Sequence, residues 1–342
     1  MSFQTQLTSL VNAVEIDRDF TIHHANYLPL TISPDLRSRF KQLAPELQTK
    51  YVVARIRNYL YDIYFDRSLL NIQAIEAAEL VTSSIKTQLI DGVDVDFYQR
   101  LQQSNTSLGY RDLNWQIIAE TEDRELIVVK DGLHLHISRQ KHLPPEFKQA
   151  NIGETTSIYL PHNLVDRDTY ISVGSYGSPQ PSSSVQLYFN FTPDAAVAIV
   201  RKLTGELNQL KIPFQFAILH DPALFYRCDC GTLRLDRSNY SILQSLIAEI
   251  YHAYQSEFSP QVPLFTKLLA PGLSIAEVPV TGSSFGMQRC ELLATGLFTA
   301  CEGGQIAADK LSIVERVLRA AKVDLAQPYL NPAGSDCYDK FG

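Results

Sequence analysis

The chain has 342 residues, of which 45% are hydrophobic and 20% are charged, a balance typical of a globular protein with a buried core. Its 30 Lys and Arg residues are outnumbered by 37 Asp and Glu residues, so the net charge is −7 and a nucleic-acid partner is not expected. The start lacks the basic and apolar segments of a signal peptide, and no run approaches the roughly 20 apolar residues of a membrane span. Five cysteines, an odd number in a long chain, do not suggest a disulfide framework. We therefore expect a cytoplasmic protein that has reduced thiols and does not bind a membrane.

The first hundred residues carry apolar side chains at the spacing of helices. Pro34 and Pro45 mark breaks between these helices, and Asp94 stands where it would cap the last one. We predict helices within residues 7–16, 46–65 and 94–103, and a helical region that spans residues 1–105.

The pattern changes after Asn105, where short segments alternate between apolar and polar residues and are rich in β-branched side chains. Asp131-Gly132 stands between two of these segments and predicts a tight hairpin turn. We predict strands at 114–120, 124–130 and 132–137, and further strands of the same sheet at 156–161, 169–177 and 184–191.

From residue 193 onward, helices and strands alternate. Pro193 stands near the first turn of an amphipathic helix, and Ser238 or Asn239 would cap a longer one. The fold class is therefore α+β, with a helical N-terminal region followed over residues 106–342 by a mixed, largely antiparallel sheet flanked by helices. We expect the two regions to form one compact unit. The predicted helices are 193–211, 238–258, 286–302 and 307–322, and the predicted strands are 212–219 and 231–236.

The sequence of residues 265–289 predicts a packed loop whose polar residues serve a function. The segment combines large apolar residues with three glycines, which permit backbone shapes that other residues resist. It also holds Lys267, Glu277 and Arg289. Binding and catalytic residues concentrate on loops that a rigid scaffold positions, so these three charges are site candidates.

The histidines and cysteines offer weaker candidates. His134 and His136 would project from one face of a strand, with His142 nearby, but no further metal ligand stands at a fixed spacing. We favour histidines that face water over a metal site, although the basic run around them could bind a phosphate or an acidic peptide. Cys228 and Cys230 form a C-x-C pair without further zinc ligands, and we favour buried thiols.

No standard phosphate loop, nucleophile elbow or zinc-binding helix motif occurs. What remains is a set of charged residues next to Gly- and Pro-containing loops with aromatic neighbours. Arg227 follows Tyr226 in a turn after an apolar strand, and Arg289 follows a Ser-Ser-Phe-Gly step that would begin a helix, a favourable place for an anion. The set consists of Lys130, Arg227, Asp229, Lys267, Glu277 and Arg289.

Several stretches resemble the HopA-type effector family of bacterial type III secretion. The resemblance runs from about residue 50 to the C-terminus, and its late block, PLFTKLLAPGLSIAEVP with SSFGMQRC, is the most specific. The other matching stretches are NTSLGYRDLNW (105–115), VVKDGLHLHI (128–137), YISVGSYG (170–177), QLYFNF (186–191) and IPFQFAILHDPALFYRCD (212–229).

The resemblance implies a lyase, because relatives act as lyases in the biosynthesis of class V lanthipeptides and thioamitides. We expect no cofactor and no metal. In these pathways a separate kinase-like protein phosphorylates Ser or Thr of a ribosomal precursor peptide, and the lyase removes the phosphate by β-elimination to leave a dehydroamino acid. The reaction needs a base for the Cα proton, a cationic cradle for the phosphate and a general acid. A homodimer is one assembly to consider.

The resemblance also assigns roles to residues. Lys267, Arg227 and Arg289 stand at matching family positions, with Lys267 as base or phosphate ligand and the two arginines as phosphate ligands. The candidate catalytic residues are Lys267, His162, His220 and Glu277, and the candidate substrate- or phosphate-binding residues are Arg227, Arg289, Arg234, Lys130, Asp229 and Tyr188.

The chain departs from the family pattern at four positions. Gln186 stands where relatives tend to carry Arg, Ala217 where they carry Lys, Arg234 where they often carry Tyr, and Ser283 where they carry Glu. The loss of two cations would weaken the binding of a phosphate dianion, since charge-assisted hydrogen bonds are about twice as strong as neutral ones. We expect Arg234 to replace one of these charges.

Three hypotheses follow. The chain is a lyase for a phosphorylated peptide, a non-catalytic relative that binds a precursor peptide or a partner enzyme, or a diverged tailoring enzyme that acts on an unphosphorylated peptide. The mass change of a co-expressed peptide would distinguish the three.

Overall fold

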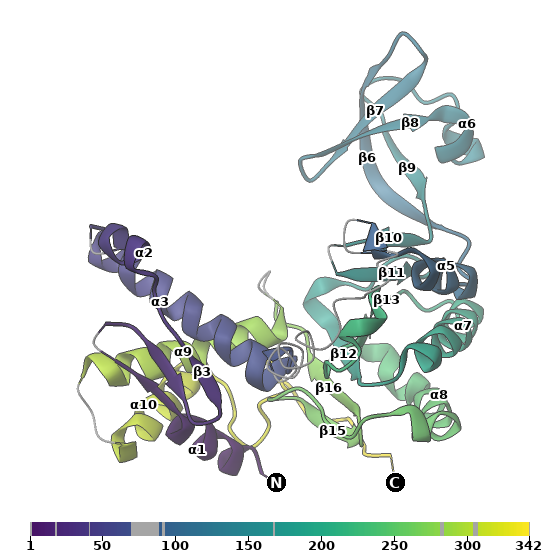
Figure 1. Cartoon of the computed structure of the whole chain (residues 1–342). Helices are drawn as coiled ribbons and strands as arrows, with labels where there is room; N and C mark the ends of the chain where they lie inside the picture. The colour runs from purple at the N-terminus through teal and green to yellow at the C-terminus, as the bar shows by residue number, and fades with distance from the viewer. Residues whose placement is uncertain are drawn as a thin grey trace.

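The computed structural model describes residues 2–17, 19–40, 42–69, 89–90, 93–166, 168–280, 284–303 and 307–341. Helices of the N-terminal part lie beside one face of a central sheet, other helices lie on its other face, and a smaller sheet projects from it (Figure 1). One hydrophobic core extends from the first helix through the central sheet to the last helix. The α+β fold expected from the sequence is thus confirmed. Among the described residues, no helix is both long and apolar enough to cross a membrane.

Helices from both ends of the chain pack together. In α3, Pro45 occupies the first turn, where a missing N–H costs nothing, and Val52, Ile56 and Leu60 form the buried stripe. α3 packs on α9, and α10 packs on α9 and α1. These helices are α1 (Phe3–Ala13), α3 (Pro45–Leu60), α9 (Phe285–Glu302) and α10 (Ala307–Ala320), with the short α2 (Pro34–Phe40) before α3.

A π-helical turn, η1 (Tyr61–Phe65), continues α3 directly. The Asp66 N–H donates to the Tyr61 carbonyl, five residues earlier, at 3.1 Å, which is the bond that defines this wider turn. Gly286 of α9 allows the turn to pack closely, because a Cβ at this position would lie 2.6 Å from the ring of Phe65. Residues 61–66 are therefore held against α9.

A three-stranded antiparallel sheet interrupts the helical region. The sequence predicts a helix through residues 7–16, but α1 ends at Ala13 and Val14 begins a strand. Val14 is buried and its strand pairs with the next one, so tertiary pairing overrides the helical periodicity here. The strands are β1 (Val14–Ile16), β2 (Ile22–His24) and β3 (Tyr27–Leu30), and a separate short pair is formed by β4 (Leu89–Ile90) and β5 (Val93–Asp94).

The central sheet has seven antiparallel strands in the order β10-β11-β13-β14-β12-β16-β15. Its apolar face packs against α7 (Pro193–Gln209) and α8 (Tyr240–Ala253), which lie together on one side of the sheet in Figure 1. The strands are β10 (Asn163–Val165), β11 (Thr169–Val173), β12 (Ser184–Phe189), β13 (Phe214–Leu219), β14 (Gly231–Asp236), β15 (Lys267–Ala270) and β16 (Leu273–Glu277).

Residues 265–289 form a strand pair and the start of a helix, so the prediction of a packed loop is wrong. β15 and β16 are joined by a turn at Pro271-Gly272, and β16 lies inside the sheet between β12 and β15. Gly272 has a φ of 77°, and a Cβ there would lie 2.2 Å from the Ser259 carbonyl oxygen. The many apolar residues of the segment are therefore strand residues that fill the core.

The smaller sheet has the order β8-β7-β6-β9 and a core of its own around Trp115, Leu126 and Ile158. The predicted three-strand meander is confirmed, and Asp131 and Gly132 both have positive φ, as a two-residue hairpin turn requires. The sequence places all strands in one sheet, but β9 belongs here while β11 and β12 belong to the central sheet. The strands are β6 (Tyr110–Glu120), β7 (Glu125–Lys130), β8 (Leu133–Ser138) and β9 (Thr155–Leu160). The short helix α6 (Arg139–His142) lies between β8 and β9 in the chain.

Side-chain caps start several of the predicted helices. Asp94 accepts the Phe97 N–H at 2.8 Å and begins α5 (Val95–Ser104), as predicted. Thr192 caps α7, with Pro193 in the first turn as expected. Asn239 is the N-cap residue of α8, but its side chain makes no capping bond.

Residues 321–341, which we call the C-terminal tail, follow α10 without helix or strand. Tyr338 is buried with its ring 5.0 Å from that of Tyr240, edge to face. The Phe341 N–H donates to the Leu269 carbonyl at 2.9 Å, beside the edge strand β15. These contacts hold the C-terminal tail against α8 and the edge strand β15.

Candidate functional site

Two rows of side chains cross the face of the central sheet that points away from α7 and α8. Residues opposite each other on paired strands point to the same face. Gln186 and Ala217, where the resemblance leads us to expect cations in relatives, thus share this face with Arg234. One row is Gln215, Arg234, Gln186 and Ala276, and the next is Ala217, Thr232, Tyr188 and Ser274.

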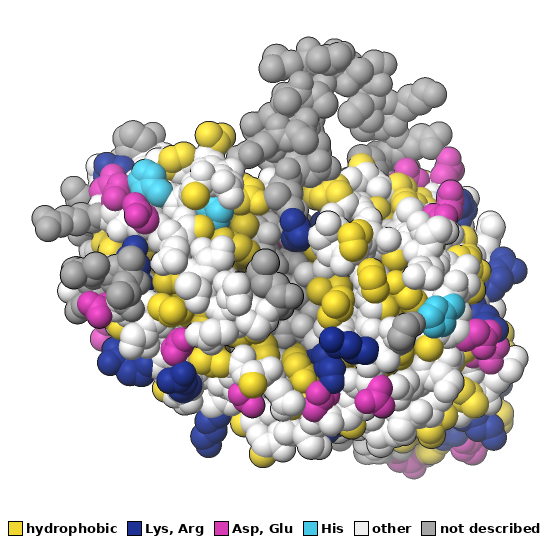
Figure 2. Space-filling model, turned by 90° about the horizontal axis from the view of Figure 1, so that it is seen from below, with side chains coloured by type: hydrophobic (Ala, Val, Ile, Leu, Met, Phe, Trp, Pro, Cys, Tyr) yellow, Lys and Arg dark blue, Asp and Glu magenta, His cyan; other side chains and the backbone are white. Residues whose placement is uncertain are grey.

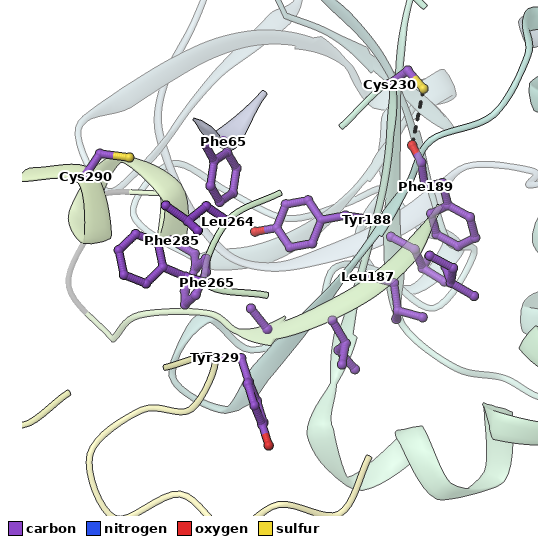
Figure 3. Packing of buried hydrophobic residues seen from close by; sticks show 14 of the residues in the cluster. Phe65, Leu187, Tyr188, Phe189, Cys230, Leu264, Phe265, Phe285, Cys290 and Tyr329 are labelled. Carbon is purple, nitrogen blue, oxygen red and sulfur yellow. Dashed lines mark hydrogen bonds between the residues drawn. The ribbon is translucent and has the colours of Figure 1, made fainter. Parts of the chain in front are cut away.

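Tyr188 lies at the centre of this face. Figure 3 shows its side chain pointing from β12 toward Phe65 and Phe285, while Leu187 and Phe189 point the other way. Burial raises the pKa of Tyr188 well above its usual value, nearby Asp229 raises it further, and Arg234 and Arg289 oppose the rise. The Tyr188 hydroxyl therefore stays protonated and can donate a hydrogen bond.

Arg289 is buried beside Tyr188, in the first turns of α9. Its guanidinium donates to the carbonyl oxygens of Pro328 at 3.1 Å and Leu330 at 2.9 Å, and lies 4.9 Å from the centre of the Phe285 ring. No carboxylate of the described residues forms an ion pair with it. Burial lowers the pKa of Arg289 to about 10, which leaves it a cation at neutral pH. Arg289 thus anchors the C-terminal tail and carries a positive charge that no described carboxylate neutralises in an ion pair.

Arg227 has the opposite surroundings. Its guanidinium donates to both carboxylate oxygens of Asp229, at 2.9 and 3.0 Å, and lies 3.3 Å from a carboxylate oxygen of Asp66. Both carboxylates are buried. Burial and the nearby Asp229 raise the pKa of Asp66 to about 6, against the effect of Arg227. Arg227 is therefore fully neutralised by its own protein and is not a free phosphate ligand.

Arg234 stands on β14 between Gln215 and Gln186 and is half-buried. Its Nε has no hydrogen-bond partner, and no carboxylate of the described residues forms an ion pair with it. Desolvation lowers its pKa, and Asp236 acts in the opposite direction. Arg234 is thus a second cation on this face that lacks an ion pair among the described residues.

These residues form one connected group, which we call the sheet-face cluster. Tyr61 of η1 joins it, because burial raises the pKa of its hydroxyl and Asp229, Asp66 and Tyr188 raise it further. The group can bind an anion through its two uncompensated arginines and can supply a neutral phenol and a carboxyl that titrates near neutral pH. The cluster consists of Tyr61, Asp66, Tyr188, Arg227, Asp229, Arg234 and Arg289.

The comparisons with known proteins connect this arrangement to a family. Residues 160–330, half of the chain, match the model of the HopA1 effector protein family. The chain belongs to this family. No curated protein sequence matches the chain.

Two solved structures are similar to this HopA1 family member. An effector protein from Pseudomonas syringae pv. tomato strain DC3000 shares 14% identity over 77% of this chain and 96% of its own, with a TM-score of 0.44. An effector protein from Pseudomonas syringae pv. syringae strain 61 shares 14% identity over 83% of this chain and 98% of its own, with a TM-score of 0.41.

Lys267 and Glu277 lie apart from the cluster. Both point to the opposite face of the central sheet, since Lys267 pairs with Ile275 and Glu277 pairs with Val185. Lys267 forms an ion pair with Asp336 of the C-terminal tail. Within the HopA1 family region, these two charges therefore anchor the tail.

Glu277 is buried and fully engaged by that contact. Its carboxylate accepts the Asn331 N–H at 2.8 Å and the Tyr338 hydroxyl at 3.0 Å, and lies 3.3 Å from Arg237. Three donors already occupy most of the lone-pair positions of this carboxylate, so Glu277 is committed to holding the C-terminal tail.

The remaining site candidates are dispersed. Lys130 belongs to the smaller sheet, where it pairs with Asp112 at 2.8 Å and faces the ring of Trp115. His162 precedes β10, and its backbone carbonyl accepts the Val173 N–H. His220 follows β13, and its backbone N–H donates to the backbone carbonyl of Asp168. The two histidines therefore adjoin opposite ends of β11. Ser283, the fourth departure from the HopA1 family pattern, lies outside the described residues.

The described histidines and cysteines form no group of three ligands that could hold a metal. His134 and His136 are exposed on β8, and His142 Nδ1 accepts the Ser138 N–H at 2.9 Å. Cys228 and Cys230 are buried, as expected, and burial raises the pKa of each thiol to about 12.

Tyr61 and Asp66 were missed by the sequence analysis. Both lie outside the region that matches the HopA1 family, in the stretch YLYDIYFDR, which reads as an ordinary amphipathic helix. The one feature of this stretch that could have marked it as a site is the density of aromatic and acidic residues at the end of a helix. Only the packing of η1 against α9 and the 226–230 turn gives these residues a role.

Proposed function

We propose that this HopA1 family member is a lyase that removes phosphate by β-elimination from phosphorylated Ser or Thr of a ribosomal precursor peptide. The observation that carries the proposal is the pair of uncompensated arginines, Arg234 and Arg289, beside the protonated Tyr188 on one face of the central sheet. A phosphate dianion is the ligand that such a pair favours, since arginine offers a planar fork of donors. Family membership supports the same chemistry.

The reaction consists of one proton transfer and one bond cleavage. A base takes the Cα proton, the electron pair of that C–H bond forms the Cα–Cβ double bond, and the Cβ–O bond breaks. Its electron pair leaves with the phosphate, which departs as inorganic phosphate. Arg234 and Arg289 would hold the phosphate, and the Tyr188 hydroxyl would donate a hydrogen bond to the leaving oxygen.

Within the cluster, Asp66 is our candidate for the base. Its pKa of about 6 leaves it ionised at neutral pH but more basic than an exposed carboxylate. Lys267, the base expected from the resemblance, is held by Asp336 on the other face of the sheet. A carboxylate with a raised pKa in the cluster therefore fits the role better than Lys267 does.

The proposed partners follow from the chemistry. The chain has no phosphate-binding loop with which to bind ATP, so a separate kinase-like protein would supply the phosphorylated peptide. The reaction would take place in the cytoplasm, where the precursor peptide is made.

The test is incubation of the purified protein with a phosphoserine peptide, with inorganic phosphate and peptide mass as readouts. We expect a product lighter by phosphoric acid, and loss of product with Arg234→Gln. Arg319→Gln, which removes an exposed arginine from α10, is the matched control and should keep full activity. Intact phosphopeptide after long incubation with the unaltered protein would overturn the proposal.

A non-catalytic peptide-binding protein is the second candidate. It is favoured by the positions of Gln186 and Ala217, which leave two neutral side chains beside Arg234 where relatives carry cations. This alternative predicts that the phosphopeptide binds, that binding weakens with Arg234→Gln, and that no phosphate is released. The mass readout separates it from the first proposal.

A further inference from the structure

A pocket of about 730 Å³ lies at the edge of the central sheet, outside the sheet-face cluster. One wall is the side of α1 that carries Phe3 and Gln6, another is the segment before β15, and the floor includes residues of η1 and the C-terminal tail. The volume is within the usual range of small-molecule sites, roughly 300–1,000 Å³.

The charges around this pocket have one sign. Arg67, Lys267 and Lys340 line it, and no Asp or Glu is among the described lining residues. This contrasts with the chain as a whole, where acidic residues outnumber basic ones. Lys267 is paired with Asp336, but no ion pair joins Arg67 or Lys340 to a carboxylate of the described residues. Within the described part of the chain, neither of these two cations is therefore neutralised by an ion pair.

Aromatic rings supply the rest of the wall. Phe265, Tyr27 and Tyr329 line the pocket, and Tyr64 is fixed by a hydrogen bond to His24 Nε2 at 2.7 Å. Figure 2 views the molecule from the side of α1, β15 and the chain ends, where hydrophobic side chains lie between basic and acidic ones. The lining of the pocket itself combines aromatic rings with basic side chains, which suits a ligand that is part anion and part apolar body.

Two of the nine described non-glycine residues with positive φ line this pocket. Arg67 has a φ of 65° and Phe265 a φ of 70°, a left-handed conformation that side chains larger than Asn rarely adopt. Each such residue costs on the order of 1 kcal/mol or more, and strained residues tend to persist where they shape a ligand site. Both strained side chains line this one pocket.

We propose that this pocket binds an organic anion in which a carboxylate or phosphate is joined to an aromatic or apolar group. Arg67 and Lys340 bind the anion, and the rings of Phe265, Tyr27 and Tyr329 enclose the apolar group. The anion is either a free small molecule or an acidic residue next to an aromatic one in a peptide. The inference does not depend on the proposed lyase activity, because Arg67 and Lys340 take no part in that reaction.

The test is calorimetric titration with 3-phenylpropionate, its neutral amide and the capped dipeptide acetyl-Glu-Phe-amide. We expect the free acid or the dipeptide to bind, and the neutral amide to bind at least about tenfold more weakly, because a charge-assisted bond contributes about 1.5–3 kcal/mol. Dipeptide binding as tight as that of the free acid would assign the pocket to a peptide. Binding of the free acid alone would assign it to a small molecule.

Two variants keep the proposal falsifiable. Arg67→Asn removes the charge while Asn tolerates the left-handed backbone, and Lys340→Glu changes an exposed side chain, so both should fold. Each should weaken binding of the anionic probe by about tenfold, whereas Arg319→Gln, at an exposed arginine of α10, should leave it unchanged. Equal binding of acid and amide, no binding of any probe, or no effect of either variant would overturn the proposal.

Discussion

Arg227 and Arg289 lie in the same cluster, yet their surroundings differ in charge. Two buried carboxylates enclose Arg227, whereas backbone carbonyls and an aromatic ring enclose Arg289. Both stood at family positions and both looked like phosphate ligands in the sequence. The difference teaches that a buried arginine is available to a substrate only if the protein itself leaves its charge unpaired.

Replacing Arg227 should have the largest effect on stability. Arg227→Met would leave Asp66 and Asp229 buried without a cation, and we expect a loss of about 3–5 kcal/mol in the free energy of unfolding near pH 8. Urea denaturation measures this loss, with the exposed Arg319→Met as control. A loss no larger than that of Arg289→Met would break the contrast between the two arginines.

Replacing Asp66 should change the free energy of unfolding by about 2 kcal/mol in a pH-dependent way. The pKa of Asp66 rises from 3.8 to about 6 on folding, so between these values the folded state holds a proton that the unfolded chain has released. The unaltered protein therefore loses stability as the pH rises through this window, and Asp66→Asn does not. Unfolding free energies of the two proteins should agree near pH 4 and favour the variant above pH 6. A constant difference across this range would show that Asp66 is not the titrating group.

Arg289→Met should cost about 1–2 kcal/mol, less than Arg227→Met. It removes a buried cation together with its bonds, so no unpaired charge stays behind, but the carbonyls of Pro328 and Leu330 lose their donors. Hydrogen exchange should speed up in the C-terminal tail around these residues. Unchanged exchange there would contradict the role of Arg289 as the anchor of the tail.

Adding a cation at Gln186 should have the smallest effect. Gln186→Arg would stand beside Arg234 on the open face and should tighten phosphopeptide binding by roughly threefold to tenfold. Gln116→Arg, on the smaller sheet, is the matched control. If both variants tighten binding equally, the gain comes from overall charge and the sheet face is not the phosphate site.

Local signals in the sequence predicted local structure well. The Asp131-Gly132 turn, the Asp94 cap and the alternating strands around them depend on neighbours a few residues away, and all three are confirmed. The hairpin of β15 and β16 was missed because β16 is buried inside the sheet, so its residues do not alternate between apolar and polar.

The site was predictable only in part, for the same physical reason. Tyr188, Arg227, Asp229, Arg234 and Arg289 were named from the sequence and do come together. Their charge state depends on Asp66, which pairs with Arg227 from a distant part of the chain. No short-range pattern records such a pairing, so the neutralised and the free arginine looked alike.

The π-helical turn determines the direction in which the side chains after it point. Because η1 holds one residue more per turn than an α-helix would, it sets the direction in which Asp66 and Arg67 leave the helix. Asp66 reaches the sheet-face cluster and Arg67, the next residue, lines the pocket on the other side. Deleting a single residue from Tyr61–Phe65 would turn both side chains by about 100° and aim each one away from its partners. One extra residue in one turn thus sets the orientation of side chains in both the sheet-face cluster and the pocket.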